Sequence, residues 1–327
     1  MMKRTLLPSA IFILLLASWA QEPGNNDGPP SSEANTVLQP RQAGALDFIA
    51  YGDMRFTDPH DQHNTNPRAR RALVQRIAKE DPELVAMTGD IVLTGDHASD
   101  WQVYASESKP LRDAGIKLFP TIGNHDVRDD PQAALPYFFK NFPETQGRRW
   151  YSVQDGPVFF IILDSESDES DSSEQGKWLQ SQLDHLPSET DFLFLVFHHP
   201  CYTRSMGGMI AMGGHPARTQ EQHLATLLEQ RARQMKAKVL VVSGHVHNYE
   251  RYQHGGVTYL VSGGGGATPV MVRRSSHDFY KEGGPTYHYI KFHVAGHHLK
   301  AEMVKYEDVN GGPVWKLKDS FELTSGQ

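Results

Sequence analysis

Five apolar segments of the 327-residue chain end in side chains that can bind a metal ion. A single Gly-Asp pair is often only a turn or a helix cap, and a lone histidine is usually structural. The same kind of ending five times in one chain is hard to attribute to folding alone, so we expect the endings to meet in one site. In chain order they are Gly52-Asp53, Gly89-Asp90, Gly123-Asn124-His125-Asp126, His198-His199 and Gly244-His245-Val246-His247.

The side-chain types at these endings favour a transition metal. Mixed carboxylate, amide and imidazole ligands suit Fe, Mn or Zn better than Ca²⁺ or Mg²⁺, which prefer shells made only of oxygen. His245 and His247 stand two residues apart and can serve two neighbouring ions, which in paired sites lie roughly 3.5–4 Å apart. Four of the five endings carry a glycine just before the first polar side chain, which allows a sharp turn and keeps bulk out of a crowded site.

Buried strands are predicted to carry these endings. Strand-like runs rich in Val, Ile, Leu and Phe cover residues 46–53, 83–90, 116–126, 192–200 and 238–247. Amphipathic stretches between them predict helices at residues 68–80, 99–113, 173–186 and 219–235. This alternation indicates a largely parallel α/β arrangement, in which ligands bind at the carboxyl ends of the strands.

The rest of the chain predicts further strands. Residues 150–165 form a hairpin pattern with Asp155-Gly156-Pro157 at its turn, and residues 257–323 give strand-like runs with few helices. Two sheets packed face to face, with helices outside, would accommodate both halves in one α/β domain over residues 46–327.

Composition limits the function. The net charge is −7 and no basic stripe stands out, which argues against a dedicated nucleic-acid binder. The single cysteine, Cys201, cannot form an internal disulfide, and a buried structural thiol is a better interpretation of it than a nucleophile.

The N-terminus predicts export. Lys3 and Arg4 precede an apolar run at 11–16 and small residues up to Ala20, which is the order of a signal peptide over residues 1–20 with cleavage after Ala20. The alternative is an uncleaved anchor, but the apolar run is shorter than the ~20 residues of a spanning helix. Residues 21–45, rich in Pro, Gly, Ser and Asn, predict a flexible linker, and the location is secreted or periplasmic.

The ordered set GD, GD, GNHD, HH and GHVH resembles the calcineurin-like metallophosphoesterase superfamily. The segment GHVHNYER, with HHP upstream and WYS…LDS before it, is most similar to the purple-acid-phosphatase-like branch, and the resemblance covers roughly residues 46–306. It implies a four-layer αββα sandwich with a dinuclear metal centre. It also implies a role for each matching residue: Asp90 would bridge both ions, Asn124, His198 and His245 would complete one shell, Asp53 and His247 would hold the other ion, and His125, oriented by Asp126, would act as general acid or substrate contact.

Two positions depart from the family pattern. Much of the superfamily has Asp-x-His in the first motif, but position 55 is an arginine, which has no lone pair to offer. Purple acid phosphatases have a tyrosine where this chain has Leu93, so iron-loaded protein should lack their tyrosinate colour. Three explanations stay open: His60 or His63 replaces the missing ligand, water fills a weak site, or Arg55 binds a phosphate oxygen beside one firmly bound ion. We favour the last.

The expected function is that of an exported metal-dependent phosphoester hydrolase acting on a small phosphoester through a metal-activated water. His199 and His215 lie at the root of, or on, the glycine- and methionine-rich loop at 201–216 and are further candidates for contacting substrate, although His215 can equally be an exposed loop histidine. One alternative is a cyclic-nucleotide or other phosphodiesterase. Another is a non-catalytic phosphate-binding or interaction protein with a degraded first metal site.

Overall fold

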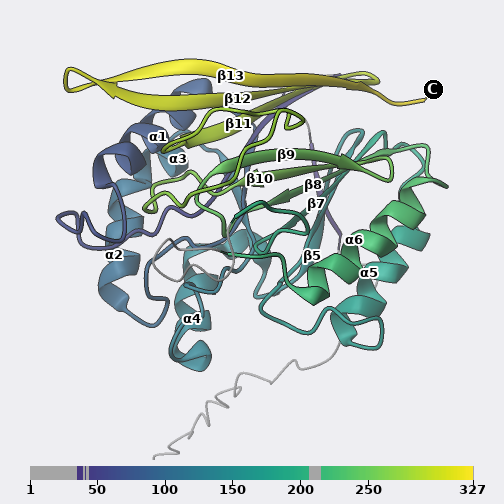
Figure 1. Ribbon diagram of the computed structural model, residues 1–327. Helices are drawn as coiled ribbons and strands as arrows, with labels where there is room; N and C mark the ends of the chain where they lie inside the picture. The colour runs from purple at the N-terminus through teal and green to yellow at the C-terminus, as the bar shows by residue number, and fades with distance from the viewer. Residues whose placement is uncertain (1–34, 40, 42–43, 206–214, 327) are drawn as a thin grey trace, which may run out of the picture. The chain divides into compact units, whose positions relative to one another are not determined.

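Two mixed β-sheets packed face to face form the centre of the protein, as Figure 1 shows for a computed structural model that describes residues 35–39, 41, 44–205 and 215–326. The residues from Ser32 onward make one compact unit. The seven-stranded sheet has the order β1 (Asn35–Leu38), β5 (Tyr151–Asp155), β6 (Val158–Ile162), β7 (Phe192–Phe197), β8 (Lys238–Ser243), β10 (Val257–Ser262), β9 (Tyr249–His254). The six-stranded sheet has the order β13 (Gly312–Thr324), β12 (His298–Val309), β11 (Tyr287–Ala295), β2 (Ala45–Tyr51), β3 (Leu84–Met87), β4 (Lys117–Pro120).

Parallel pairs form the centre of each sheet and also join β1 to β5. Strands β2, β3 and β4 run parallel in one sheet, and β6, β7, β8 and β10 run parallel in the other. Antiparallel pairs add β11, β12 and β13 to the first sheet, and β5 and β9 to the second. All five predicted strands that end in metal-binding residues are present, but they are divided between the two sheets.

Helices cover the outer face of each sheet (Figure 1). Apolar residues of α1 (Pro67–Glu80), α2 (Ala98–Glu107), α3 (Lys109–Asp113) and α4 (Pro131–Asn141) share a buried cluster with the six-stranded sheet. Residues of α5 (Glu174–Asp184) and α6 (Thr219–Ala232) share another with the seven-stranded sheet. A short 3₁₀ helix, η1 (Pro143–Thr145), follows α4. The predicted α/β fold of four αββα layers is therefore confirmed.

Burial on both faces explains why the central strands are continuously apolar. In β7, Phe192, Phe194 and Val196 point into the core between the sheets. The alternate residues Leu193, Leu195 and Phe197 pack against α5 and α6 instead. Between the sheets, the Phe48 ring of β2 contacts the Phe194 ring of β7 edge-on, with 5.1 Å between ring centroids. Such aromatic pairs contribute about 0.5–1.5 kcal/mol beyond the area they bury.

Several local predictions need correction. The predicted linker over 21–45 is not flexible to its end, because Asn35–Leu38 forms β1 and pairs in parallel with β5. The predicted helix at 99–113 is two helices, since Pro110 has no N–H to donate and cannot continue α2. Helix α4 was not predicted, although Asp130 caps its N-terminus by accepting the N–H groups of Gln132 and Ala133.

The predicted signal peptide, residues 1–20, lies outside the described residues. Within the part of the chain that the structure describes, no helix combines the length and apolarity that crossing a bilayer requires.

Candidate metal centre

The two sheets contribute their carboxyl-terminal ends to one site. Asp53, Asp90 and Asn124 follow β2, β3 and β4 of the six-stranded sheet, whereas His198 follows β7 and His245 and His247 follow β8 of the seven-stranded sheet. One potential ligand atom from each of Asp53, Asp90 and His198 lies within 4.8 Å of the other two. The convergence predicted from the sequence is therefore seen across both sheets.

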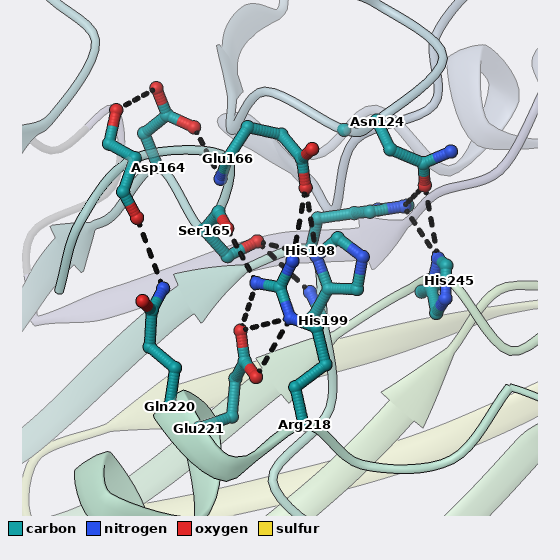
Figure 2. A network of polar contacts seen from close by, with 12 residues as sticks. Asn124, Asp164, Ser165, Glu166, His198, His199, Arg218, Gln220, Glu221 and His245 are labelled. Atoms are coloured by element: carbon teal, nitrogen blue, oxygen red, sulfur yellow. Dashed lines mark hydrogen bonds and ion pairs between the residues drawn. The ribbon is translucent and has the colours of Figure 1, made fainter.

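Asn124, His198 and His245 form the tightest group of potential ligands (Figure 2). The Asn124 Oδ1 atom lies 3.1 Å from His198 Nε2 and 3.1 Å from His245 Nδ1, and these two ring nitrogens are 3.2 Å apart. Asp90 Oδ1 lies 3.3 Å from His198 Nε2. Because a carbonyl oxygen only accepts, the 2.8 Å contact of His198 Nδ1 with Thr88 O places the proton on Nδ1 and a lone pair on Nε2.

These four atoms fit a metal ion. Zinc–nitrogen bonds are about 2.0–2.1 Å long, so the ligand atoms of a tetrahedral ion lie roughly 3.4 Å apart. The spacings of 3.1–3.2 Å among Asn124, His198 and His245, and of 3.3 Å from His198 Nε2 to Asp90 Oδ1, are close to that value. Burial lowers the pKa of His198 to about 4, so its imidazole is neutral at pH 7 and can bind a cation.

Asp53 and His247 form a second group of potential ligands. The Nδ1 atom of His247 donates to Thr268 O at 2.7 Å, which leaves a lone pair on Nε2. This Nε2 atom is buried, has no hydrogen-bond partner among the described residues and lies 3.5 Å from Asp53 Oδ1. Burial and the neighbouring Asp90 charge raise the pKa of the Asp53 carboxyl well above its ordinary value. Two facing lone-pair atoms without a donor between them also fit a cation.

Arg55 lies inside the site and is paired with Asp90. Its Nε and Nη2 atoms donate to Asp90 Oδ2 at 3.2 and 3.1 Å, and its side chain is only 11% exposed. Burial alone would raise the pKa of Asp90, but the neighbouring His198 imidazole and Arg55 guanidinium hold it well below its ordinary value. Since His198 is neutral at pH 7, the Arg55 guanidinium is the permanent positive charge beside this carboxylate.

The backbone at the strand ends is strained. Asp53, Arg55, Asp90 and His245 have φ angles of 58°, 48°, 51° and 66°, a left-handed conformation that is uncommon without glycine. Close approach explains one of the neighbouring glycines, because a Cβ atom on Gly123 would collide with the backbone nitrogen and Oδ1 of Asp90. The glycines thus let the ligand turns approach one another.

His125 lies beside Asp90, but the predicted role of Asp126 is wrong. The backbone N–H of His125 donates to Asp90 Oδ1 at 2.9 Å, and its Nδ1 donates to Leu93 O at 2.7 Å. The fully buried Asp126 carboxylate instead accepts the backbone N–H groups of Ile91, Val92 and Gly123. Asp126 therefore joins the second and third motif turns, and the Leu93 carbonyl orients the His125 ring.

The structure brings His215 and His199 to the site as well. His215 Nδ1 lies 3.1 Å from His245 Nε2, and the His199 ring is centred 4.1 Å from the His245 ring. Figure 2 shows the network behind His199, whose Nδ1 contacts Ser165 Oγ at 3.0 Å and Glu166 Oε1 at 3.1 Å. By contrast, the side chain of His60 is 93% exposed and pairs with Asp58, and His63 is also exposed, so neither replaces the missing ligand in this conformation.

Two supporting features were missed in the sequence. Arg70 is fully buried in α1 and donates from Nη1 to Arg55 O at 3.0 Å. The glycine run that follows β10 lies against the first motif, where Gly265 N donates to Gly52 O at 2.8 Å. In the sequence, Arg70 differs from other arginines only by its place on the apolar side of a predicted helix, which could have indicated a buried role.

Comparisons with known proteins agree with this geometry. The sequence model of the calcineurin-like phosphoesterase family matches residues 55–249. Probable purple acid phosphatase 20 of Arabidopsis thaliana is 23% identical over 241 residues, which cover 69% of this chain and 51% of that protein. Probable inactive purple acid phosphatase 24 of the same plant is 24% identical over 231 residues, 65% of this chain and 37% of that protein.

A solved structure shows the same fold. The purple acid phosphatase PPD1 from yellow lupin seeds superimposes with a TM-score of 0.67 at 21% identity, covering 87% of this chain and 55% of that one. The chain spans about half the length of the first of these Arabidopsis relatives and of the lupin protein. The resemblance to the purple-acid-phosphatase-like branch is thereby confirmed.

Proposed function

Because the chain belongs to the calcineurin-like phosphoesterase family, we propose that it is a metal-dependent hydrolase of small phosphate esters. The observation that supports this most is the group of Asn124, His198 and His245, whose potential ligand atoms lie 3.1–3.2 Å apart, with Asp90 Oδ1 3.3 Å from His198 Nε2. With the His245 proton on Nε2, toward His215 Nδ1, a cation would satisfy these buried acceptors together.

In this proposal the site residues have distinct roles. Asp90, Asn124, His198 and His245 would hold one Fe, Mn or Zn ion, and Asp53 and His247, with Asp90, would surround a second position. When bound, the metal supplies positive charge that neutralises a phosphate ester and lowers the pKa of water. Arg55 offers five N–H donors, of which Asp90 takes two, so its guanidinium retains donors for a phosphate oxygen.

His125 and His215 border the same space and would contact substrate. His125 is fixed by Leu93 O and keeps Nε2 as an acceptor for a hydroxyl group of the substrate or a water molecule. His215 Nδ1 lies 3.1 Å from His245 Nε2, and it can position a substrate from that side.

A substrate panel tests the proposal. We expect the purified protein to hydrolyse p-nitrophenyl phosphate or its bis-ester, and to lose activity with a chelator and with Asn124→Ala, by at least about 100-fold. Asn141→Ala in α4, whose Nδ2 bonds only the Tyr137 carbonyl, is the matched control and should keep the activity. Hydrolysis of the bis-ester alone would favour a phosphodiesterase.

A non-catalytic phosphate-binding protein is the second candidate. The arginine at position 55 favours it, and the match to probable inactive purple acid phosphatase 24 covers 65% of this chain, close to the 69% covered by probable purple acid phosphatase 20. In that case phosphate would bind in a calorimetric titration while no ester of the panel was hydrolysed with any of the three metals.

We also propose that residues 1–20 direct export. The supporting pattern is Lys3 and Arg4 followed by the apolar run and the small residues up to Ala20. Mass spectrometry of the protein recovered from outside the cytoplasm should give an N-terminus at Gln21. An intact Met1 on that protein would contradict cleavage.

A further inference from the structure

The two oxygens of Asp90 have different partners. Oδ1 accepts the His125 backbone N–H at 2.9 Å and lies 3.3 Å from the lone pair of His198 Nε2, so it belongs to the group around Asn124. Oδ2 accepts both the Nε and Nη2 donors of Arg55. A carboxylate can bridge two ions through both oxygens or through one, and here a guanidinium holds Oδ2, which leaves only Oδ1 for any metal ion.

Arg55 is fixed in this position from both sides. Its backbone N–H donates to Asp90 O at 3.0 Å, and its carbonyl accepts Nη1 of the fully buried Arg70, also at 3.0 Å. Its own φ of 48° is an uncommon conformation for a long side chain and directs it into the site. The guanidinium is therefore part of the built site and not a surface group that has folded inward.

Few ligand atoms remain that could bind a second cation tightly. Asp53 and His247 offer two facing lone-pair atoms 3.5 Å apart. Both Asp53 oxygens already accept the backbone N–H of His245, at 3.1 and 3.0 Å. A divalent ion at this position would lose Asp90 Oδ2 as a ligand and would stand near the positively charged guanidinium of Arg55.

Resting on the proposed phosphoesterase function, we infer that the Arg55 guanidinium stands in for one of the two cations, so that the protein retains only the metal ion held by Asp90, Asn124, His198 and His245. A phosphate ester then faces one metal ion and one guanidinium. The planar fork of arginine is suited to this role because it pairs with carboxylate and phosphate oxygens in the same geometry.

The number of retained ions tests the inference without an activity assay. The full chain is stripped with a chelator, titrated with Zn²⁺ in a calorimeter, and dialysed before its metal content is measured. We expect one equivalent of zinc to be retained by the wild type, with any second binding event about 100-fold weaker. In Arg55→Met, which removes the charge at similar length, the second event should strengthen at least about tenfold and the retained zinc should approach two equivalents.

Two further variants separate the causes. Arg251→Met removes a similarly buried bidentate pair, in which Arg251 donates to both oxygens of Asp319 at 2.7 and 2.8 Å, and it should retain one equivalent like the wild type. Arg55→Lys keeps the charge and should also retain one, which preserves the test if the methionine variant does not fold.

The outcomes are distinct. Two equivalents of similar affinity in the wild type, one equivalent in a folded Arg55→Met, or two in Arg55→Lys would each overturn the role of Arg55. Absence of zinc binding in all the variants and the wild type would instead overturn the proposed function.

Discussion

His125 is held in one protonation state by its surroundings. Burial lowers the pKa of its imidazole, although the Asp90 charge acts in the opposite direction, so the ring is neutral at pH 7. The Nδ1–H group of His125 donates a hydrogen bond to the Leu93 carbonyl, so Nε2 is left as an acceptor. A neutral ring with this tautomer binds a donor from substrate or water and has no proton to give from Nε2.

We therefore predict that His125 is a substrate contact and not the general acid. His125→Ala should lower kcat/KM by similar factors, about tenfold or more, for p-nitrophenyl phosphate and for an alkyl phosphate, since neither leaving group would receive its proton from this ring. Steady-state kinetics on the two esters at pH 7 measure this.

The matched control is His63→Ala, which removes an exposed histidine from the loop after the first motif. It should leave kcat/KM unchanged for both esters. A loss of bound metal in this variant would instead indicate that His63 is the replacement ligand. A loss on the alkyl ester at least ten times larger than on p-nitrophenyl phosphate would contradict our assignment of His125 and favour a general acid.

At the scale of single residues, the potential ligands could be predicted from the sequence and the supporting residues could not. Asp, Asn and His at the end of a buried strand indicate metal binding through their side-chain types alone. The contacts of Asp126 with three backbone N–H groups, and of Arg70 with the Arg55 carbonyl, depend on which turns meet in space. The sequence around Asp126 and Arg70 does not indicate which turns come together in the fold.

The hairpin of β5 and β6 contains a carboxylate whose burial has a cost. Asp155 is 1% exposed, and its Oδ1 has no partner among the described residues. Burial and the negative charge of Glu83 raise the pKa of Asp155 to about 6. The folded protein thus binds this proton more tightly than the unfolded chain, and the free energy of unfolding falls as the pH rises from about 4 to about 6.

Asp155→Asn should remove this pH dependence. We expect the variant and the wild type to have similar stability near pH 4, and the variant to be more stable above pH 6 by on the order of 1 kcal/mol, because the amide cannot ionise. Urea unfolding followed by circular dichroism at pH 4.5 and 7.5 gives the difference.

Asp171→Asn, at an exposed position between β6 and α5, controls for the loss of one negative charge. If the free energies of unfolding of Asp155→Asn and the wild type differed more at pH 4.5 than at pH 7.5, ionisation of Asp155 would not be the cause of the pH dependence.

The strands were predictable as elements because of how they are buried. Those with both faces covered, such as β7 and β8, are apolar without interruption and leave no other interpretation. Strand β1 was missed because its short sequence NTVL is ordered only by pairing with β5, and the break between α2 and α3 was missed because Pro110 was passed over.

At the scale of the whole molecule, the sequence pattern alone did not say which strands share a sheet. The strands β2 and β7 have the same apolar character, yet they lie in different sheets and meet through side chains such as Phe48 and Phe194. Tertiary contacts between distant segments decide which strands pair, so the sequence predicted two sheets without assigning each strand to one of them.

The division of the ligands between the sheets has a consequence for the motions of the protein. Asp90 and Asn124 come from one sheet, and His198 and His245 come from the other, so an ion held by these four residues would cross-link the two sheets. Ligand binding to the folded state alone raises its stability by mass action. Chelation should therefore speed amide hydrogen–deuterium exchange at the carboxyl ends of β3, β4, β7 and β8, where the sheets can part locally. The opposite ends of the same strands, held by the aromatic core, should exchange at an unchanged rate.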